Sequence, residues 1–173
     1  MNKKRKLLVI LCGLPSTGKT ILAKALSKKI DAVHLSTDAI RKDLFPKPQY
    51  TAKEKILVYE KMFEKADNLL RIGESVILDA TFFKEFLRKK AQGIAEKNNA
   101  KFILIETKCR EETVKRFFER RITHKTLSDA DYNVYKMLKA EFEPVKERHL
   151  VINCEEETEA KIGAVLEWIK KEL

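Results

Sequence analysis

The sequence predicts an α/β protein in which a parallel β-sheet carries helices on both faces, giving a three-layer sandwich. The 173-residue chain alternates short apolar runs with longer segments whose apolar residues recur at helical spacing. Strands joined by helices of this length run parallel, because the chain returns to the same end of the sheet before each new strand. The polar residues of chemical interest directly follow the apolar runs, and ligands of parallel sheets bind at this edge.

The apolar pattern predicts five strands, at residues 6–12, 33–36, 75–80, 101–107 and 149–153. It predicts helices at residues 18–30, 38–45, 51–72, 82–99, 110–121, 129–141 and 156–172.

Two of these helices carry sequence signals for where they begin or end. Thr51 and Glu54 form a capping box before the helix at 51–72, and Gly73 is placed to end that helix. Ser128 and Asp131 are placed to cap the helix at 129–141. We expect one domain over residues 1–173, with a small helical lid at about 116–132.

Composition favours a cytoplasmic protein without a membrane partner. Charged residues make up 36% of the chain and hydrophobic residues 44%, and the apolar runs are no longer than strands. The basic residues 3–6 precede an apolar run, as in a signal peptide, but we expect that run to be the first strand. Cys12, Cys109 and Cys154 lack the spacing of metal ligands, so we expect small buried thiols in a reducing cytosol.

The formal net charge of +10 leaves two interpretations open. A basic surface attracts polyanions, so RNA or DNA is a possible partner. Alternatively, the charge reflects a site for phosphorylated ligands together with a solvated surface rich in Lys and Glu.

The segment after the first predicted strand reads G-L-P-S-T-G-K-T and fits the phosphate-loop pattern G-x-x-x-x-G-K-[ST] at every fixed position. Its glycines let backbone N–H groups converge on phosphate oxygens, and the following helix start adds a positive dipole end. Lys19 is expected to reach the β- and γ-phosphates and Thr20 to ligate Mg²⁺. We therefore expect ATP and Mg²⁺ as cofactors, bound by Gly13, Leu14, Pro15, Ser16, Thr17, Gly18, Lys19 and Thr20.

Asp38 and Arg41 follow the second predicted strand. Asp38 either caps the next helix or accepts a proton from an acceptor hydroxyl. Arg41 lies three residues later, on the same side of the first helical turn, where a guanidinium can hold that hydroxyl or a phosphate.

Asp79 ends the third predicted strand, at the usual Walker-B position, where an Asp holds Mg²⁺ directly or through water. The alternative is that it caps the next helix. No Glu follows it, so the activating carboxylate of many motor ATPases is missing. Arg88, in the next predicted helix, either points back to the site or is solvated.

Arg116 and Arg120 follow the fourth predicted strand and share one helix face, at the base of a loop. Two arginines in this place suit a lid that neutralises a transferring phosphoryl group and excludes water. The alternative is a charged solvated face paired with Glu112 and Glu119. Arg121 is a weaker third candidate.

Together these motifs resemble the P-loop kinases of the adenylate-kinase-like group, most closely the polynucleotide-kinase and seryl-tRNA-kinase type. The resemblance covers roughly residues 6–145 and is carried by the phosphate loop, Asp38-x-x-Arg41, the patch beginning at Asp79, and Arg116-x-x-x-Arg120. It implies a sheet ordered 2-3-1-4-5, Asp38 as general base, Arg41 as a clamp on the acceptor, and Arg116 and Arg120 as lid contacts to the phosphates.

The chain departs from the resemblance in two places. Ala80 and Phe82 replace polar residues of the third patch, so the resemblance does not fix a polynucleotide acceptor. The Asp-Gly-Phe/Tyr-Pro-Arg signature of adenylate-type kinases is absent, which argues against a nucleoside monophosphate acceptor.

The sequence favours an ATP-dependent kinase that acts on a hydroxyl-bearing acceptor, either a small molecule or a nucleic-acid end. A polynucleotide 5′-hydroxyl kinase is the narrower alternative. A nucleotide-gated switch or ATPase module without an acceptor is the alternative of another class, although such a module would not need Asp38 and Arg41 together.

Overall fold

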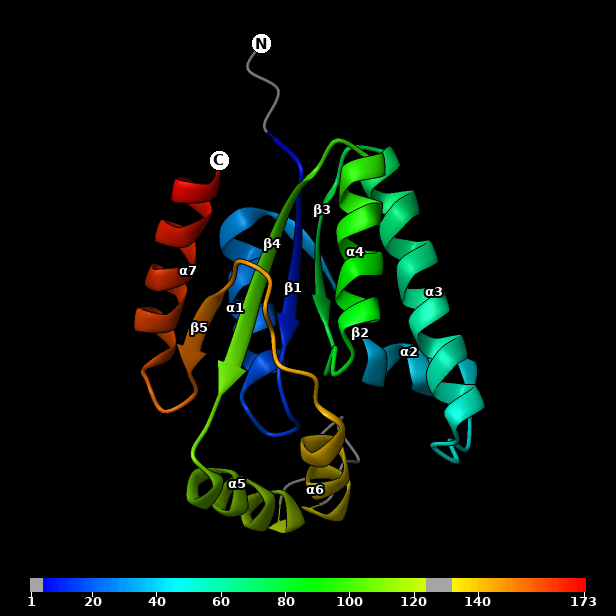
Figure 1. Ribbon diagram of the computed structural model, residues 1–173, viewed down its shortest axis with the longest axis vertical. Coiled ribbons are helices and arrows are strands. Elements are labelled where there is room, and N and C mark those ends of the chain that lie inside the picture. Colours follow the sequence, from blue (N-terminus) through cyan, green and yellow to red (C-terminus); the bar gives the residue numbers. More distant parts are fainter. Residues whose placement is uncertain (1–4, 124–131) are drawn as a thin grey trace.

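The sheet has five parallel strands in the order β2-β3-β1-β4-β5 (Figure 1). The structure is a computed structural model that describes residues 5–123 and 132–173. The strands are β1 (Leu7–Cys12), β2 (Ala32–Ser36), β3 (Ser75–Asp79), β4 (Lys101–Lys108) and β5 (Leu150–Asn153). The predicted fold class and strand order are confirmed.

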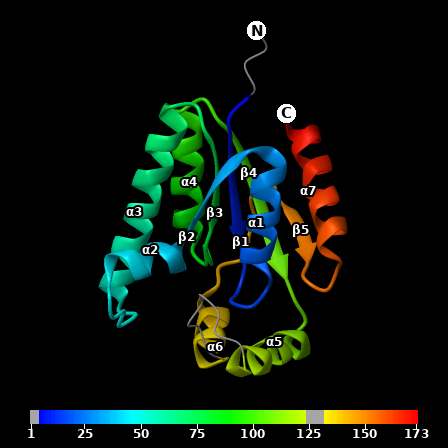
Figure 2. The same ribbon diagram turned by 180° about the vertical axis from the view of Figure 1, so that it is seen from behind.

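Helices cover both faces of this sheet and its carboxyl edge (Figures 1 and 2). α3 and α4 pack on one face and α1 and α7 on the other, while α5 and α6 lie beyond the carboxyl ends of the strands. The helices are α1 (Lys19–Ile30), α2 (Thr37–Leu44), α3 (Ala52–Arg71), α4 (Glu85–Lys97), α5 (Glu111–Thr123), α6 (Tyr132–Glu141) and α7 (Thr158–Glu172).

β1 lies at the centre of the sheet because all six of its residues are apolar and buried. Its alternate side chains divide between the two faces. Leu8 and Ile10 join the core under α3 and α4, and Val9 and Leu11 join the core under α1 and α7. The phosphate loop is therefore anchored to the most deeply buried strand.

Both ends of α3 confirm their predicted signals. Thr51 accepts a hydrogen bond from the Glu54 N–H at 3.2 Å. The Glu54 carboxylate in turn accepts from the Gln49 and Tyr50 N–H groups, two residues and one residue before the cap. Gly73 follows the helix at φ +99°, a left-handed backbone that favours glycine. Ser128 and Asp131 lie outside the described residues.

α4 begins at Glu85, three residues later than the predicted start at 82. Phe82 has a left-handed backbone at φ +46°, which a helix cannot contain. Its ring is fully buried, and its N–H donates to the Tyr59 hydroxyl at 3.0 Å. The turn thus places an aromatic ring in the core before the helix starts.

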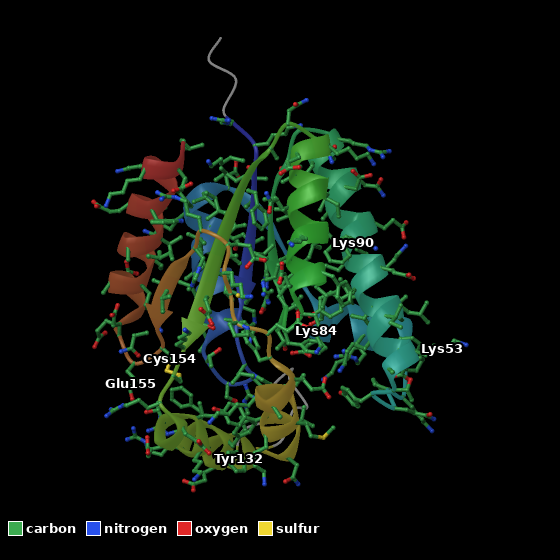
Figure 3. All side chains as sticks on the ribbon, viewed as in Figure 1. Lys53, Lys84, Lys90, Tyr132, Cys154 and Glu155 are labelled. Atoms are coloured by element: carbon green, nitrogen blue, oxygen red, sulfur yellow. A yellow bond between two sulfur atoms is a disulfide. The ribbon has the colours of Figure 1, made fainter. Side chains whose placement is uncertain are left out.

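The cysteine expectation is wrong for two of the three residues. Cys109 and Cys154 form a disulfide with a Cα–Cα distance of 5.3 Å, and Figure 3 shows its sulfur atoms beside Cys154. The register of β4 and β5 explains this pairing. Lys108 pairs with Asn153 at the ends of the two strands, and a cysteine directly follows each of these residues. Cys12 is free and buried, as expected, and burial raises the pKa of its thiol to about 12.

None of the helices in the described part of the chain is both long and apolar enough to cross a membrane.

Candidate active site

The phosphate loop joins β1 to α1, and backbone geometry requires glycine at its first position. Gly13 has φ +149°, and a Cβ there would lie 2.4 Å from the Thr107 hydroxyl and 2.6 Å from the Thr107 carbonyl oxygen. β4 therefore packs directly against the start of the loop. Gly18, at φ +81°, has a left-handed backbone at the N-cap position immediately before α1.

Side chains within the loop hold its shape. The Thr17 hydroxyl donates to the Leu14 carbonyl oxygen at 2.7 Å and is hydrogen-bonded to the Thr107 hydroxyl at 2.7 Å. The Lys19 ammonium donates to the same Leu14 carbonyl at 2.8 Å, so it lies folded over the loop. Burial lowers the pKa of Lys19, while the nearby charges of Asp79 and Asp38 oppose that shift.

Thr20 and Asp79 meet although 59 residues separate them in the sequence. The Thr20 hydroxyl donates to Asp79 Oδ2 at 2.7 Å, and Asp79 is 4% exposed at the carboxyl end of β3. A hydroxyl and a carboxylate oxygen side by side fit Mg²⁺, which keeps most of its waters and takes few protein ligands. The part of the chain that the structure describes holds no group of three or more His, Cys, Asp or Glu side chains suited to a metal.

His34 is a contact that the sequence analysis missed. Its Nε2 lies 3.1 Å from Asp79 Oδ2, so the Asp79 carboxylate contacts both Thr20 and His34. β2 and β3 are neighbours in the sheet, but their register pairs Asp79 with Ser36 and His34 with Ile77, so strand order alone would not have indicated this contact.

Asp38 and Arg41 lie on the first turn of α2, on one side, as predicted. Ser36 caps this helix by accepting from the Ala39 N–H at 3.0 Å, so Asp38 is not the N-cap. Arg41 Nη1 lies 3.3 Å from Asp38 Oδ1, and the guanidinium stacks over the Tyr50 ring at 5.0 Å. Asp38 and the Arg41 guanidinium thus lie side by side, and both line the cavity described next.

A cavity of about 420 Å³ connects the phosphate loop to these residues. Its walls are the phosphate loop, the end of β3, the first turn of α2 and the start of α3, and α6 covers it. The residues that line it are Pro15, Ser16, Gly18, Lys19, Thr20, Thr37, Asp38, Arg41, Tyr50, Thr51, Lys55, Tyr59, Asp79, Ala80, Thr81, Phe83, Arg121, Val134, Met137, Leu138 and Glu141.

Within the described part of the chain, three buried polar atoms on the cavity wall lack hydrogen-bond partners. They are Ser16 Oγ, Arg41 Nε and Arg121 Nη1, and all three residues line this cavity. Leaving a buried donor unsatisfied costs about 1–3 kcal/mol, more for a charged group. The cavity is therefore suited to an anionic ligand that would accept from both guanidinium groups.

Among the candidate lid arginines, Arg121 lines the cavity. Burial lowers the pKa of Arg121, and the charge of Asp38 opposes this. Arg116 donates to the Thr113 hydroxyl at 3.1 Å, and neither Arg116 nor Arg120 lines the cavity. Their contacts to phosphate stay predictions, and residues 124–131 of the predicted lid lie outside the described part of the chain.

Arg88 lies away from the cavity, in the core. Its side chain is 1% exposed and donates to the carbonyl oxygens of Phe82 at 2.9 Å and Pro144 at 3.1 Å. It also forms an ion pair with Glu147 at 3.2 Å. Arg88 therefore fastens α4 to the segment between α6 and β5.

Comparison with known families assigns most of the chain, including the cavity, to one family. The sequence model of the AAA domain family AAA_33 matches residues 8–145. The chain belongs to this AAA domain family. The matched region begins in β1 and includes every residue that lines the cavity.

Two curated relatives of this AAA domain share part of its length. The L-seryl-tRNA(Sec) kinase of Methanococcus maripaludis is 36% identical over 114 residues, 60% of this chain and 41% of the relative. An uncharacterized protein of Mycobacterium tuberculosis is 29% identical over 114 residues, 59% of this chain and 22% of the relative. The alignments thus cover about a fifth to two fifths of the length of these relatives.

Solved structures of kinases share the fold. The APS kinase CysC of Mycobacterium tuberculosis, in complex with AMPPNP and APS, has a TM-score of 0.75 at 15% identity, over 96% of this chain and 98% of that one. A gluconokinase of Sinorhizobium meliloti has a TM-score of 0.69 at 14% identity, over 97% and 94%. The AAA domain therefore has the P-loop kinase fold.

Proposed function

We propose that this protein is an ATP-dependent phosphotransferase that moves the γ-phosphoryl group of ATP to a hydroxyl group of an acceptor. One observation carries the proposal: Lys19, Asp79, Asp38 and Arg41 line a single cavity. A nucleotide-binding module needs the first two residues only. A cavity that continues from the phosphate loop to a carboxylate–guanidinium pair also accommodates an acceptor.

In this mechanism the protein mainly positions the reactants and stabilises charge. Lys19 and the loop N–H groups bind the β- and γ-phosphates. Thr20 and Asp79 would hold Mg²⁺, which when bound neutralises charge on the phosphate oxygens. Arg121 stabilises negative charge on the transferring group, and Arg116 and Arg120 join it when the lid closes.

The transfer step balances as an in-line substitution at phosphorus. The acceptor O–H bond breaks and its proton passes to Asp38. The acceptor oxygen forms a bond to the γ-phosphorus while the bond to the bridging oxygen breaks, and ADP leaves. Arg41 holds the acceptor in line for this attack.

The test is transfer of phosphate from γ-labelled ATP to a panel of acceptors with Mg²⁺ present. Asp38→Asn should bind ATP with unchanged affinity and lose about 10²–10⁴-fold in transfer, because only the proton acceptor is removed. Lys19→Met should lose ATP binding as well. Near-normal transfer by Asp38→Asn would refute the base assignment, and ATP hydrolysis that no acceptor stimulates would favour a switch or ATPase module.

A polynucleotide 5′-hydroxyl kinase is a second candidate. The net charge of +10 and the similarity to an L-seryl-tRNA(Sec) kinase support it. Labelling of a 5′-hydroxyl RNA or DNA oligonucleotide, lost in Asp38→Asn, would establish it.

A further inference from the structure

The part of the cavity wall outside the phosphate loop has its own chemistry. Arg41 and Lys55 bring two positive charges to its wall, from α2 and α3. Val134, Met137 and Leu138 of α6 contribute apolar side chains to the same cavity wall. An acceptor that binds here meets both cations and apolar side chains.

The two cations differ in how the described residues pair them. Arg41 forms an ion pair with Asp38 through Nη1 at 3.3 Å, which is long for a charge-assisted bond, and its buried Nε has no hydrogen-bond partner among the described residues. The Lys55 ammonium lies 4.8 Å from the centre of the Phe83 ring. Among the described residues no carboxylate forms an ion pair with it.

Given the phosphotransferase function proposed above, we propose that the acceptor is a small molecule carrying an oxyanion group, either a carboxylate or a phosphate, besides the hydroxyl that is phosphorylated. The oxyanion accepts from Arg41 Nε and pairs with Lys55, and this fixes the hydroxyl beside Asp38. Charge-assisted bonds to a guanidinium are directional, so they orient the acceptor as well as hold it.

The same walls disfavour a nucleic-acid end. Single-stranded nucleic acids bind by stacking bases on aromatic rings, but the rings here already carry cations. The Arg41 guanidinium covers Tyr50, and the Lys55 and Lys84 ammonium groups lie over Phe83. Glu141 adds a negative charge to the wall, and a cavity of about 420 Å³ is the size of a small-molecule site.

A direct test follows the Arg41 Nε–H signal by NMR. The sample is the full chain with Mg²⁺ and a non-hydrolysable ATP analogue, and the signal is assigned by its loss in Arg41→Gln. Inorganic phosphate and acetate are titrated separately, which distinguishes the two oxyanions. We expect a saturable shift with one of them and roughly tenfold weaker binding in Lys55→Met. Lys53→Met is the matched control, because Lys53 is exposed and points away from the protein (Figure 3).

Transfer assays with paired acceptors complete the test. The pairs are glycerate with glycerol, gluconate with glucose, and a hexose 6-phosphate with the free hexose, together with a 5′-hydroxyl oligonucleotide. We expect at least a tenfold higher kcat/KM for the anionic member of a pair, lost in Lys55→Met and kept in Lys53→Met. Preference for neutral acceptors or for the oligonucleotide would overturn the proposal, as would an Arg41 signal that neither anion moves. Steady ATP hydrolysis without any labelled acceptor would refute the kinase proposal instead, because the NMR signal reports anion binding independently of transfer.

Discussion

At the scale of single residues, the arginines of α5 differ in their position relative to the cavity. Arg116, Arg120 and Arg121 all belong to α5, yet only Arg121 lines the cavity. Successive residues of a helix are about 100° apart, so Arg121 projects from another face than the Arg116–Arg120 pair. Because its buried Nη1 has no hydrogen-bond partner among the described residues, Arg121 is the arginine of α5 that we propose as a donor to phosphate.

We therefore predict that Arg121→Gln lowers kcat by about 10²–10³-fold, because one preorganised donor to the transition state is lost. The affinity for ATP should change much less. Steady-state transfer kinetics and an ATP titration separate the two quantities. Arg116→Gln and Arg120→Gln serve as comparisons, and a larger loss of kcat in either of them would mean that α5 turns when the lid closes.

At the scale of elements, we expect that replacing a glycine of the phosphate loop and replacing a glycine of a helix have opposite effects on stability. We predict that Gly13→Ala unfolds or severely destabilises the loop, because the added Cβ would overlap Thr107 and the backbone at φ +149° is strained for alanine. Gly93→Ala in α4 should instead stabilise the protein by about 1 kcal/mol, since it adds helix propensity. Gly93 is exposed, and a Cβ there meets nothing within 4 Å. Thermal unfolding and ATP binding of the two variants check both signs, and equal effects would contradict the packing of β4 on the loop.

The elements also show which features sequence patterns can predict. The strands follow from local periodicity and the Asp38–Arg41 contact follows from helical spacing, whereas the sheet order was implied by the resemblance to the P-loop kinases. Thr20 and Asp79 were expected to share a metal because Thr20 ends the phosphate-loop motif and Asp79 stands at the usual Walker-B position, and the Thr20 hydroxyl lies 2.7 Å from Asp79 Oδ2. The orientation of α5, which directs Arg121 and not Arg116 or Arg120 to the cavity, depends on three-dimensional packing. The contact of His34 with Asp79 depends on it as well. A single sequence carries no signal for such packing.

At the scale of the whole molecule, the disulfide links the two connections that frame α5 and α6. Cys109 and Cys154 are 45 residues apart, and the segment between them contains α5, α6 and β5 (Figure 1). Glu155 strengthens the same junction through Arg110 at 3.0 Å and through the Thr113 hydroxyl. The register of β4 with β5 created this link, and cysteine spacing in the sequence did not reveal it.

We predict that reducing this disulfide lowers the free energy of unfolding by about 2–4 kcal/mol, since a cross-link over a loop of this length restricts the unfolded chain. For a chain of this size, that loss corresponds to a fall in Tm of roughly 4–16 °C. Calorimetry with and without a reductant measures it, and alkylation of the unreduced, unfolded protein should modify Cys12 alone. The double variant Cys109→Ser with Cys154→Ser should unfold at the lower temperature and ignore the reductant. A wild-type Tm that the reductant leaves unchanged, with all three cysteines alkylated, would show that the two thiols do not form the disulfide in solution.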